Sequence, residues 1–370
     1  MTIAIVVAAP GEAPLLAACR DVAETELWSP LTAPAWLAHA PGAIGAYARR
    51  RTGGDLRSPP LLAIDAGLRA WARNHTDRRY QSQFLLRTAI DGWAAREVLR
   101  RKPRIVVASS LAARRTFAAA RSIGSHCVLV LDVPLLRALH ADLDRAAEVW
   151  PERQFLRRFR APSWAIARQE AERVLADLVV VRGAYARSLC VADGIPEARL
   201  AVLPSAPPSA SALAPATPTG RLRLAGLAAA RHGIDTAVAA ARILGMTLVV
   251  RTGEGTEPAN LAELPGIAIA AAMVDDAPVD AVICPAICET YAAELRTTLP
   301  AIASPMASAD GRGPDPYDAV AFAGAIEQAL RASPRANAAA DGAPPAPSIT
   351  SLLSSLGLRR RDHRSRRRSR

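Results

Sequence analysis

The sequence predicts an α/β protein made of two domains in series, each with a parallel sheet covered by helices on both faces. Short apolar runs rich in Val and Ile alternate with amphipathic helical runs, a pattern typical of parallel sheets. The alternation stops at Pro204–Gly220, which mixes Pro, Ser and Ala without periodicity, and restarts afterwards. A chain of 370 residues is also too long for one ordinary core. We expect an N-terminal domain at 1–204, a linker at 205–220, a second domain at 221–333 and a tail at 334–370.

The composition is that of a globular protein. Apolar residues make up 51% of the chain and no apolar run reaches the length of a membrane span, which argues against disorder and against a transmembrane segment. The N-terminus has no basic stretch before its apolar run, so we interpret it as a strand rather than a signal peptide. The five cysteines stand in strand-like and helix-like runs, and no His or Cys pair completes a metal site. We expect reduced, buried thiols in a cytoplasmic protein that binds no metal.

The first domain alternates strands and helices from its N-terminus. The expected strands are Thr2–Ala9, Glu26–Ser29, Ile105–Ala108, Cys127–Asp132, Leu178–Val181 and Leu200–Leu203. The expected helices are Ala13–Glu24, Leu61–Arg73, Ser82–Arg100, Leu111–Ile123, Trp164–Ala176 and Tyr185–Asp193, with an amphipathic piece around Trp36–Arg51. The long helix that ends at Arg100 is followed by Arg101 and Lys102, cations that suit a helix C-terminus.

The second domain repeats the alternation. Its expected strands are Arg221–Leu224, Thr247–Arg251, Ile267–Ala271, Ala281–Cys284 and one after Pro300, and its expected helices are Ile234–Leu244 and Ala319–Ala332. After the buried strand Ala281–Cys284 comes a turn and then a helix that carries Glu289 and Glu294. Open α/β sheets bind their ligands beyond the carboxyl ends of their strands, so acidic residues at this place indicate a ligand site.

Three stretches, taken in order, carry a family resemblance. The first runs from Glu172 through Ala-Asp to Arg-Gly and on to Gly194-Ile-Pro-Glu-Ala-Arg-Leu-Ala-Val-Leu-Pro204. The second is Leu224-Ala-Gly226 followed by Arg231-His232-Gly233-Ile-Asp-Thr-Ala-Val, and the third is Ala281–Ser304. Together they resemble the domain junction, the glycine-rich loop and the donor segment of family 4 glycosyltransferases. The resemblance covers about residues 175–304, with a weaker match in the first half.

The resemblance implies a fold, a reaction and a set of ligands. Members of this family have two facing Rossmann-like domains, the GT-B arrangement. They transfer a sugar from a nucleotide-sugar donor to an acceptor with retention of anomeric configuration, and they need no metal or other cofactor. A leaving nucleoside diphosphate gathers negative charge, which preorganised N–H groups and guanidinium groups stabilise. The expected partners are therefore a nucleotide-sugar donor and a glycan or lipid-linked acceptor.

The resemblance places the donor diphosphate at the loop from Gly226 to Gly233. The loop Arg and Lys of the family fall at Leu227 and His232 here; Leu has no donor, and His is mostly neutral at pH 7. The neighbouring Arg231 has a guanidinium that can bind phosphate through two hydrogen bonds. The alternative is that Arg231 is a solvated loop arginine.

Glu289 and Glu294 match the carboxylate pair of the family, with four residues between them instead of seven. The resemblance implies that Glu289 lies by the sugar and Glu294 by the nucleotide ribose, in a shortened sugar-binding loop. The alternative is that Glu289 interacts with the dipole of its helix and that Glu294 is an exposed helix residue.

The resemblance to family 4 glycosyltransferases indicates three more candidate residues. Gly253 begins a Gly-Glu-Gly turn after a strand, where the family binds the nucleotide base; the alternative is an ordinary turn. Gly11 lies in the first strand–helix turn, at the acceptor loop of the family. Asp132 follows an expected strand at the place of a catalytic residue, and it either acts on an acceptor hydroxyl or caps the helix that begins near Pro134.

The net charge of +12 is concentrated in the C-terminal tail, where Arg359–Arg370 holds eight Arg and one Asp. We expect Pro334–Pro347 to be flexible and the Arg-rich end to be disordered without a partner. Binding to an anionic membrane surface, binding to nucleic acid and a solvated extension remain alternatives for this end. No aromatic residues are interleaved for base stacking, which disfavours nucleic acid.

The sequence thus predicts a hexosyltransferase that uses a nucleotide sugar, in bacterial polysaccharide or glycoconjugate synthesis. Two rival hypotheses remain. The first is a degenerate, non-catalytic relative that binds a partner or a glycan, which the substituted loop and the shortened carboxylate spacing favour. The second is a nucleic-acid-associated protein that acts through its tail.

Overall fold

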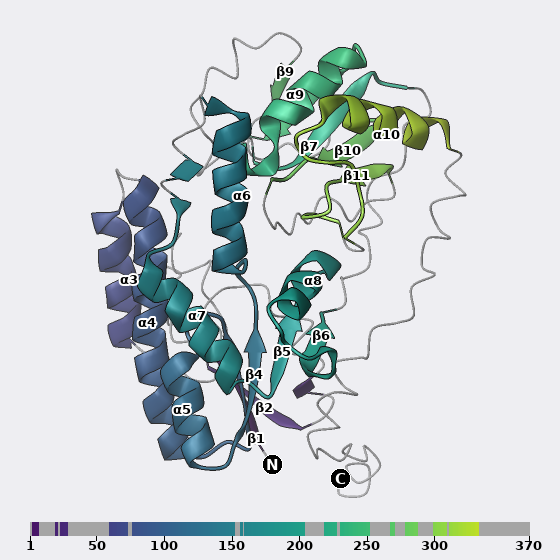
Figure 1. Cartoon of the computed structure of the whole chain (residues 1–370). Coiled ribbons are helices and arrows are strands. Elements are labelled where there is room, and N and C mark those ends of the chain that lie inside the picture. Colours follow the sequence, from purple (N-terminus) through teal and green to yellow (C-terminus); the bar gives the residue numbers. More distant parts are fainter. Residues whose placement is uncertain are drawn as a thin grey trace, which may run out of the picture.

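The computed structural model describes residues 2–6, 19–20, 23–28, 59–72, 76–151, 156–157, 159–203, 218–227, 230–251, 267–270, 278–287, 299–308 and 311–332. These residues form two parallel sheets with helices packed around each, as Figure 1 shows. The two sheets come from separate parts of the chain, one ending at Val202 and the other beginning at Arg221. Most of the expected linker lies outside the described residues, as does everything from residue 333 on.

The first sheet has six strands in the order β2-β1-β3-β4-β5-β6, and every neighbouring pair is parallel. The strand order reverses between β1 and β3, so the topological switch point of this sheet lies there. The strands are β1 (Thr2–Val6), β2 (Glu24–Trp28), β3 (Ile105–Ser109), β4 (His126–Val130), β5 (Leu178–Val181) and β6 (Leu200–Val202).

Six described helices belong to this half. They are α3 (Pro59–Trp71), α4 (Thr76–Arg101), α5 (Arg114–Ser122), α6 (Leu136–Val149), α7 (Ser163–Leu175) and α8 (Ala184–Ala192). Helix α6 differs from the others because it rises from the first sheet alongside the second half (Figure 1).

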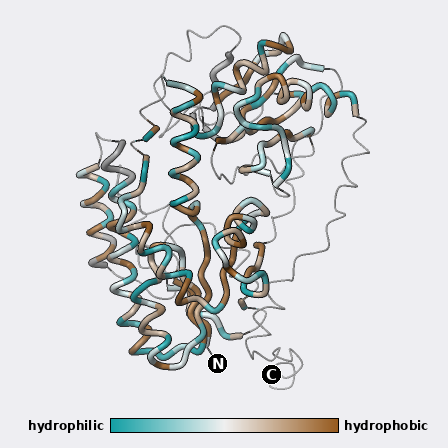
Figure 2. Tube along the Cα trace, in the orientation of Figure 1, coloured by the Kyte–Doolittle hydropathy of each residue, from teal (hydrophilic) through white to brown (hydrophobic). Residues whose placement is uncertain are grey.

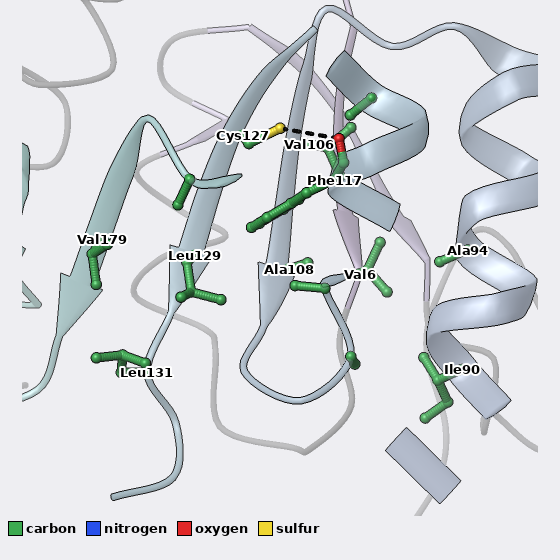
Figure 3. Close-up of a cluster of buried hydrophobic side chains, with 14 of the residues drawn as sticks. Val6, Ile90, Ala94, Val106, Ala108, Phe117, Cys127, Leu129, Leu131 and Val179 are labelled. Carbon is green, nitrogen blue, oxygen red and sulfur yellow. Dashed lines mark hydrogen bonds between the residues drawn. The ribbon is translucent and has the colours of Figure 1, made fainter. Parts of the chain in front are cut away.

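The central strands of the first sheet are buried on both faces, as expected for a parallel sheet. On one face, Val106, Leu129 and Val179 pack against Phe117 of α5 and Ile90 of α4, as Figure 3 shows. On the other face, alternate residues of the same strands form a second cluster. Figure 2 shows hydrophobic residues along these strands, whereas the helices contain both hydrophobic and hydrophilic residues.

The second sheet has the order β11-β10-β7-β8-β9, again with all neighbours parallel. Its order reverses between β7 and β10, which makes that pair the switch point. Helices α9 and α10 cover one face through Ala237, Ala241, Phe322 and Ile326. The elements are β7 (Arg221–Leu227), β8 (Thr247–Arg251), β9 (Ile267–Ala270), β10 (Ala281–Cys284), β11 (Ala301–Ala303), α9 (Ile234–Ile243) and α10 (Ala319–Arg331).

The half-buried carboxylate of Asp280 fixes the start of the second half. It accepts hydrogen bonds from Thr219 N (2.7 Å) and Gly220 N (2.8 Å), and from the Thr219 hydroxyl (2.9 Å). Arg221 N adds a longer contact of 3.3 Å to the same carboxylate. The chain therefore enters β7 through a turn that is bonded to the residue before β10.

The predicted alternation of strands and helices is confirmed, but several expected boundaries are wrong; the long helix expected from Ser82, for example, begins at Thr76. The helix expected at Leu111–Ile123 begins only at Arg114, and Leu111 adopts a left-handed φ of 68° in the loop before it. The helix expected at Ala13–Glu24 does not extend to Glu24, which lies in β2. The strand expected at Arg221–Leu224 continues to Leu227 past a register shift, so Gly226 lies in the strand and not in the loop.

Candidate active site

The switch point of the second sheet brings together two of the stretches singled out in the sequence. Arg231, His232 and Gly233 follow β7, and the segment that leads to Glu289 follows β10, the neighbouring strand. The carboxyl ends of parallel neighbours meet at one edge of the sheet, where open α/β sheets leave a crevice for ligands. Both loops therefore lie at the ligand edge of this sheet.

Gly233 allows these two loops to touch. It is the N-cap of α9 and has a left-handed φ of 76°. A Cβ at this position would overlap the carbonyl oxygen of Pro285, which follows β10. Only glycine accepts both the backbone conformation and the close approach. Two residues away on each loop, Ile287 N donates a hydrogen bond to Arg231 O at 3.2 Å.

The side chains of this loop differ in exposure. Arg231 is exposed and His232 is buried, although they are adjacent in a 3-10 turn. An exposed guanidinium can form two hydrogen bonds to a phosphate, whereas a buried imidazole is closed to solvent. The candidates Gly11, Gly253, Glu289 and Glu294 lie outside the described residues.

Residues that follow β11, within 304–308 and 311–317, contact the same edge of the second sheet. The Ser304 hydroxyl donates to Ala286 O at 2.7 Å, and the Thr236 hydroxyl on α9 donates to Pro316 O at 2.5 Å. Gly313 has a φ of 148°, and a Cβ there would overlap the carbonyl oxygen of Ala303 at the end of β11. These residues thus join the ends of β10 and β11 to the first turn of α9.

Asp132 lies at the carboxyl edge of the first sheet, two residues after β4, and is held by a buried ion pair. Both of its oxygens accept hydrogen bonds from the Arg87 guanidinium, at 3.0 and 2.8 Å, and its side chain is only 2% exposed. Arg87 also donates to Ser110 O at 2.7 Å. Asp132 does not cap the next helix. Helix α6 begins at Leu136, and the N–H of Leu136 donates to Gln169 Oε1 instead.

The switch-point loop of the first sheet, residues 110–113, is held by a buried network that sequence reasoning missed. Glu172 on α7 accepts hydrogen bonds from Leu111 N (2.6 Å), Ala113 N (2.9 Å) and Arg114 N (3.1 Å). Asp91 on α4 accepts from the next two N–H groups, Arg115 N and Thr116 N, both at 2.8 Å. These are the N–H groups that a helix N-terminus leaves without partners, so two carboxylates from distant helices cap α5.

Arg168 completes this network between the two carboxylates. It pairs with Asp91 and with Glu172, and its Nε donates to Leu111 O at 2.9 Å. All three side chains are at least 93% buried. Burial raises the pKa of Glu172 to about 7, in spite of the backbone donors and the nearby guanidinium. The only sequence signal was Glu172 itself, which was part of the family pattern; no spacing in the chain connects it with Asp91.

The junction pattern around Ala176-Asp177 has a structural role. Asp177 accepts hydrogen bonds from Cys127 N at 2.8 Å and from the Arg121 guanidinium at 2.9 Å. It therefore ties the start of β5 to β4 and α5. The Cys127 thiol beside it is buried, which raises its pKa to about 12 and makes it unreactive.

Comparisons with known proteins support the fold. No model of a known protein family matches the chain, and no curated protein sequence matches it. Among solved structures, sucrose-phosphate synthase from Thermosynechococcus elongatus matches with a TM-score of 0.53 at 14% identity, over 96% of this chain and 94% of that one. The galactosyltransferase WaaB of the lipopolysaccharide outer core matches with a TM-score of 0.49 at 13% identity, over 90% and 93% of the two chains.

A third match is UDP-GlcNAc 2-epimerase from Methanocaldococcus jannaschii, with a TM-score of 0.47 at 10% identity, over 97% of this chain and 99% of that one. The match to sucrose-phosphate synthase over nearly the full length of both chains confirms the predicted fold class, two facing Rossmann-like domains in the GT-B arrangement. Within the described part of the chain, no helix has both the length and the apolar character needed to cross a bilayer.

Proposed function

We propose that this protein is a glycosyltransferase of the family 4 type, which moves a hexose from a nucleotide sugar to a glycan or lipid-linked acceptor with retention of configuration. One observation supports the proposal: the two stretches that the sequence singled out for the donor, at Arg231–Gly233 and directly after β10, contact each other at the switch point of the second sheet. Ile287 N donates to Arg231 O there, and Gly233 contacts Pro285. The GT-B arrangement puts the first sheet opposite this edge.

The donor diphosphate binds at the loop of Arg231 and the first turn of α9. A guanidinium and the N–H groups of a helix N-terminus both stabilise the negative charge that the leaving diphosphate gathers. Glu289 lies two residues beyond Ile287 and contacts the sugar, Glu294 the ribose, and Gly253 the base. Metal independence remains part of the proposal, because Arg231 supplies the positive charge that a metal would provide.

The acceptor enters from the carboxyl edge of the first sheet, near Gly11, Asp132 and the loop at residues 110–113. In this structure the Asp132 carboxylate is paired with Arg87. Both oxygens are engaged there, so Asp132 orients Arg87 and the loop in this arrangement. The protein works on the cytoplasmic face of the membrane, with the Arg tail on anionic lipid.

Release of nucleoside diphosphate from a panel of nucleotide sugars at millimolar concentration tests the proposal. We expect nucleoside diphosphate to be released from at least one donor. We expect the rate of this release to be roughly tenfold to hundredfold lower in Arg231→Ala. Arg242→Ala is the matched control, since Arg242 is an exposed arginine in the last turn of the same helix. Release that is equal in both variants contradicts the assigned phosphate site, and no release with any donor contradicts the transferase.

A second candidate function is a non-catalytic relative that binds a nucleotide sugar or a glycan. The pairing of Asp132 with Arg87 favours it, because the candidate base of the first half is 2% exposed and engaged at both oxygens. Calorimetric titration with the same panel distinguishes the two. Binding without any release of nucleoside diphosphate, in the presence of acceptor glycans, supports the binding protein.

A further inference from the structure

Helix α6 carries an apolar stripe that lies between the two halves. Leu136, Leu139, Leu143 and Ala146 recur at intervals of three and four residues, so they lie on one face of the helix. All four are buried. The stripe belongs to one hydrophobic cluster, which we call the α6 cluster, and this cluster contains residues from both halves of the protein.

Two members of the α6 cluster come from the switch-point loops of the two sheets. Leu111 lies in the loop after β3 and is 1% exposed, and Ile287 lies after β10 and is fully buried. Leu111 adopts its left-handed backbone while Glu172 and Arg168 hold its N–H and its carbonyl. A non-glycine residue in this conformation is strained and is retained only where its surroundings fix it.

Polar and aromatic contacts join the same helix to the second half. Arg145 forms an ion pair with Asp315 at 3.0 Å, and its guanidinium lies 4.7 Å from the ring centre of Tyr317. The Tyr317 ring packs on Trp150 with centroids 5.1 Å apart, and its hydroxyl donates to Asp142 O at 3.4 Å. The exposed ion pair contributes little, so apolar contact provides most of the attachment.

The geometry points to Ile287 as a positioning residue: its side chain anchors the loop after β10 on α6 and so sets the spacing between the two switch-point loops. Its backbone makes the complementary contact, because Ile287 N donates to Arg231 O in the loop after β7. One residue therefore links the candidate phosphate loop, α6 and the segment that leads to Glu289.

The consequence for catalysis rests on the proposed function. Transfer requires the acceptor oxygen and the sugar carbon to lie within about 3–3.5 Å, and a misplacement of about 1 Å costs roughly a hundredfold in rate. Donor binding needs only the second half, whereas transfer needs both halves in fixed relation. Loss of the Ile287 anchor therefore lowers the rate of transfer more than it lowers the affinity for the nucleotide.

Hydrogen exchange in the full-length protein tests the anchor without any assay of activity. Ile287→Ala removes the side chain from the α6 cluster, and Ile283→Ala is the matched control. Ile283 is also a fully buried isoleucine of this segment, but it packs under α9 and α10. Each change leaves a cavity in a buried cluster.

We expect Ile287→Ala to speed exchange in α6 and in residues 110–113, both in the other half, by at least about tenfold. Ile283→Ala should speed exchange in the second sheet only. Unchanged exchange in α6 of Ile287→Ala overturns the proposal, as does an equal effect of both variants on α6. Ile287→Val keeps most of the side chain, so its exchange rates in α6 should stay within a few-fold of those of the wild type.

A kinetic measurement tests the consequence separately. We expect Ile287→Ala to keep its affinity for nucleoside diphosphate within about threefold while transfer falls by more than tenfold and donor hydrolysis falls less. Proportional loss of binding, transfer and hydrolysis overturns the positioning role. If wild type binds no nucleotide sugar, the proposed function fails, whereas the exchange result still decides whether Ile287 joins the halves.

Discussion

At the scale of single residues, the Glu172 carboxylate is surrounded by hydrogen-bond donors. The pKa of Glu172 is nevertheless raised. It accepts three backbone hydrogen bonds and pairs with Arg168, but Asp91 shares that arginine and the site is closed to water. Burial outweighs these contacts and raises the pKa to about 7. A group with a raised acid pKa stabilises the fold below its unfolded pKa, and the contribution is lost as the pH rises through the folded value.

We predict that the free energy of unfolding of the wild type falls by about 3 kcal/mol between pH 4.5 and pH 7.5 relative to Glu172→Gln. Glutamine keeps the oxygen that accepts from the backbone and does not titrate. Chemical denaturation at both pH values measures the difference. Glu170→Gln, a half-exposed neighbour on α7, is the control and should keep the pH dependence of the wild type. Parallel curves for wild type and Glu172→Gln would contradict the assignment.

Gly233 and Gly245 test whether close contact, rather than backbone conformation alone, holds the loops of the second sheet together. Both have a left-handed φ, 76° and 64°, at the two ends of α9. Alanine at 245 meets no atom within 4 Å, whereas alanine at 233 overlaps the Pro285 carbonyl. We predict that Gly245→Ala costs about 1 kcal/mol and that Gly233→Ala costs several times more and abolishes nucleotide binding. Equal losses of stability, measured by denaturation, would show that the contact is unimportant.

Single residues were also where prediction from the sequence failed. Leu111-Ala-Ala has a strong helix propensity, so the helix was expected to begin at Leu111. Glu172 and Asp91 instead cap α5 from other helices, and this sets its start at Arg114. No local pattern reveals a cap that comes from residues distant in sequence. The expected position of Gly226 in the loop after β7 was wrong for a related reason, since pairing with β8 carries β7 past the glycine.

At the scale of elements, α6 contains a second carboxylate with a raised pKa. Burial raises the pKa of Asp142 to about 6, and the Tyr185 hydroxyl and the Arg145 guanidinium oppose this effect in part. The charged and titratable groups around it are Arg145 on α6, Tyr185 on α8, and Asp315 and Tyr317 from the second half. The contact between α6 and the second half is therefore more stable when Asp142 is protonated than when it is ionised.

We predict that the contact between α6 and the turn at Tyr317 weakens as the pH rises from about 4 to 7, by at most about 3 kcal/mol. Asp142→Asn should abolish this dependence, because asparagine does not titrate. Hydrogen exchange of residues 311–318, corrected for the intrinsic effect of pH, measures it. Asp144→Asn changes a more exposed carboxylate on the same helix and serves as the control. A wild-type contact that is independent of pH would contradict the prediction.

Element types were predictable because period and length suffice to identify them. The apolar β-branched runs at β8 and β10 have the bounds expected from the sequence, Thr247–Arg251 and Ala281–Cys284. The order of strands in a sheet was not predictable in the same way, since it depends on long-range pairing. That order makes β7 and β10 neighbours, and hence brings Arg231 close to Ile287.

At the scale of the whole molecule, the Arg-rich end at Arg359–Arg370 lies outside the described residues, and its role remains a prediction. We expect its removal to weaken binding to vesicles that contain anionic lipid, because each arginine near such a surface contributes about 1 kcal/mol. Co-sedimentation of full-length and truncated protein with anionic and with neutral vesicles measures this effect. Nucleoside diphosphate affinity should not change. Equal binding of both proteins to anionic vesicles would contradict the membrane role, and loss of RNA or DNA binding instead would favour nucleic acid.

The two-domain GT-B architecture was predictable from the sequence, whereas the relation between its halves was not. The alternation of elements and the break after Leu203 predicted two sheets. The α6 cluster could not be predicted, because Ile287 reads as one more apolar residue in a buried stretch. Only the folded arrangement shows that it packs with Leu111 around a helix of the other half.

The central claim is that a nucleotide sugar binds at the edge where β7 meets β10. A crystal structure with bound nucleoside diphosphate tests it most directly. We expect the diphosphate to lie within hydrogen-bonding distance of the Arg231 guanidinium and the first N–H groups of α9, with Glu289 facing the same ligand. A diphosphate bound at the edge of the first sheet, or remote from Arg231, would contradict the claim.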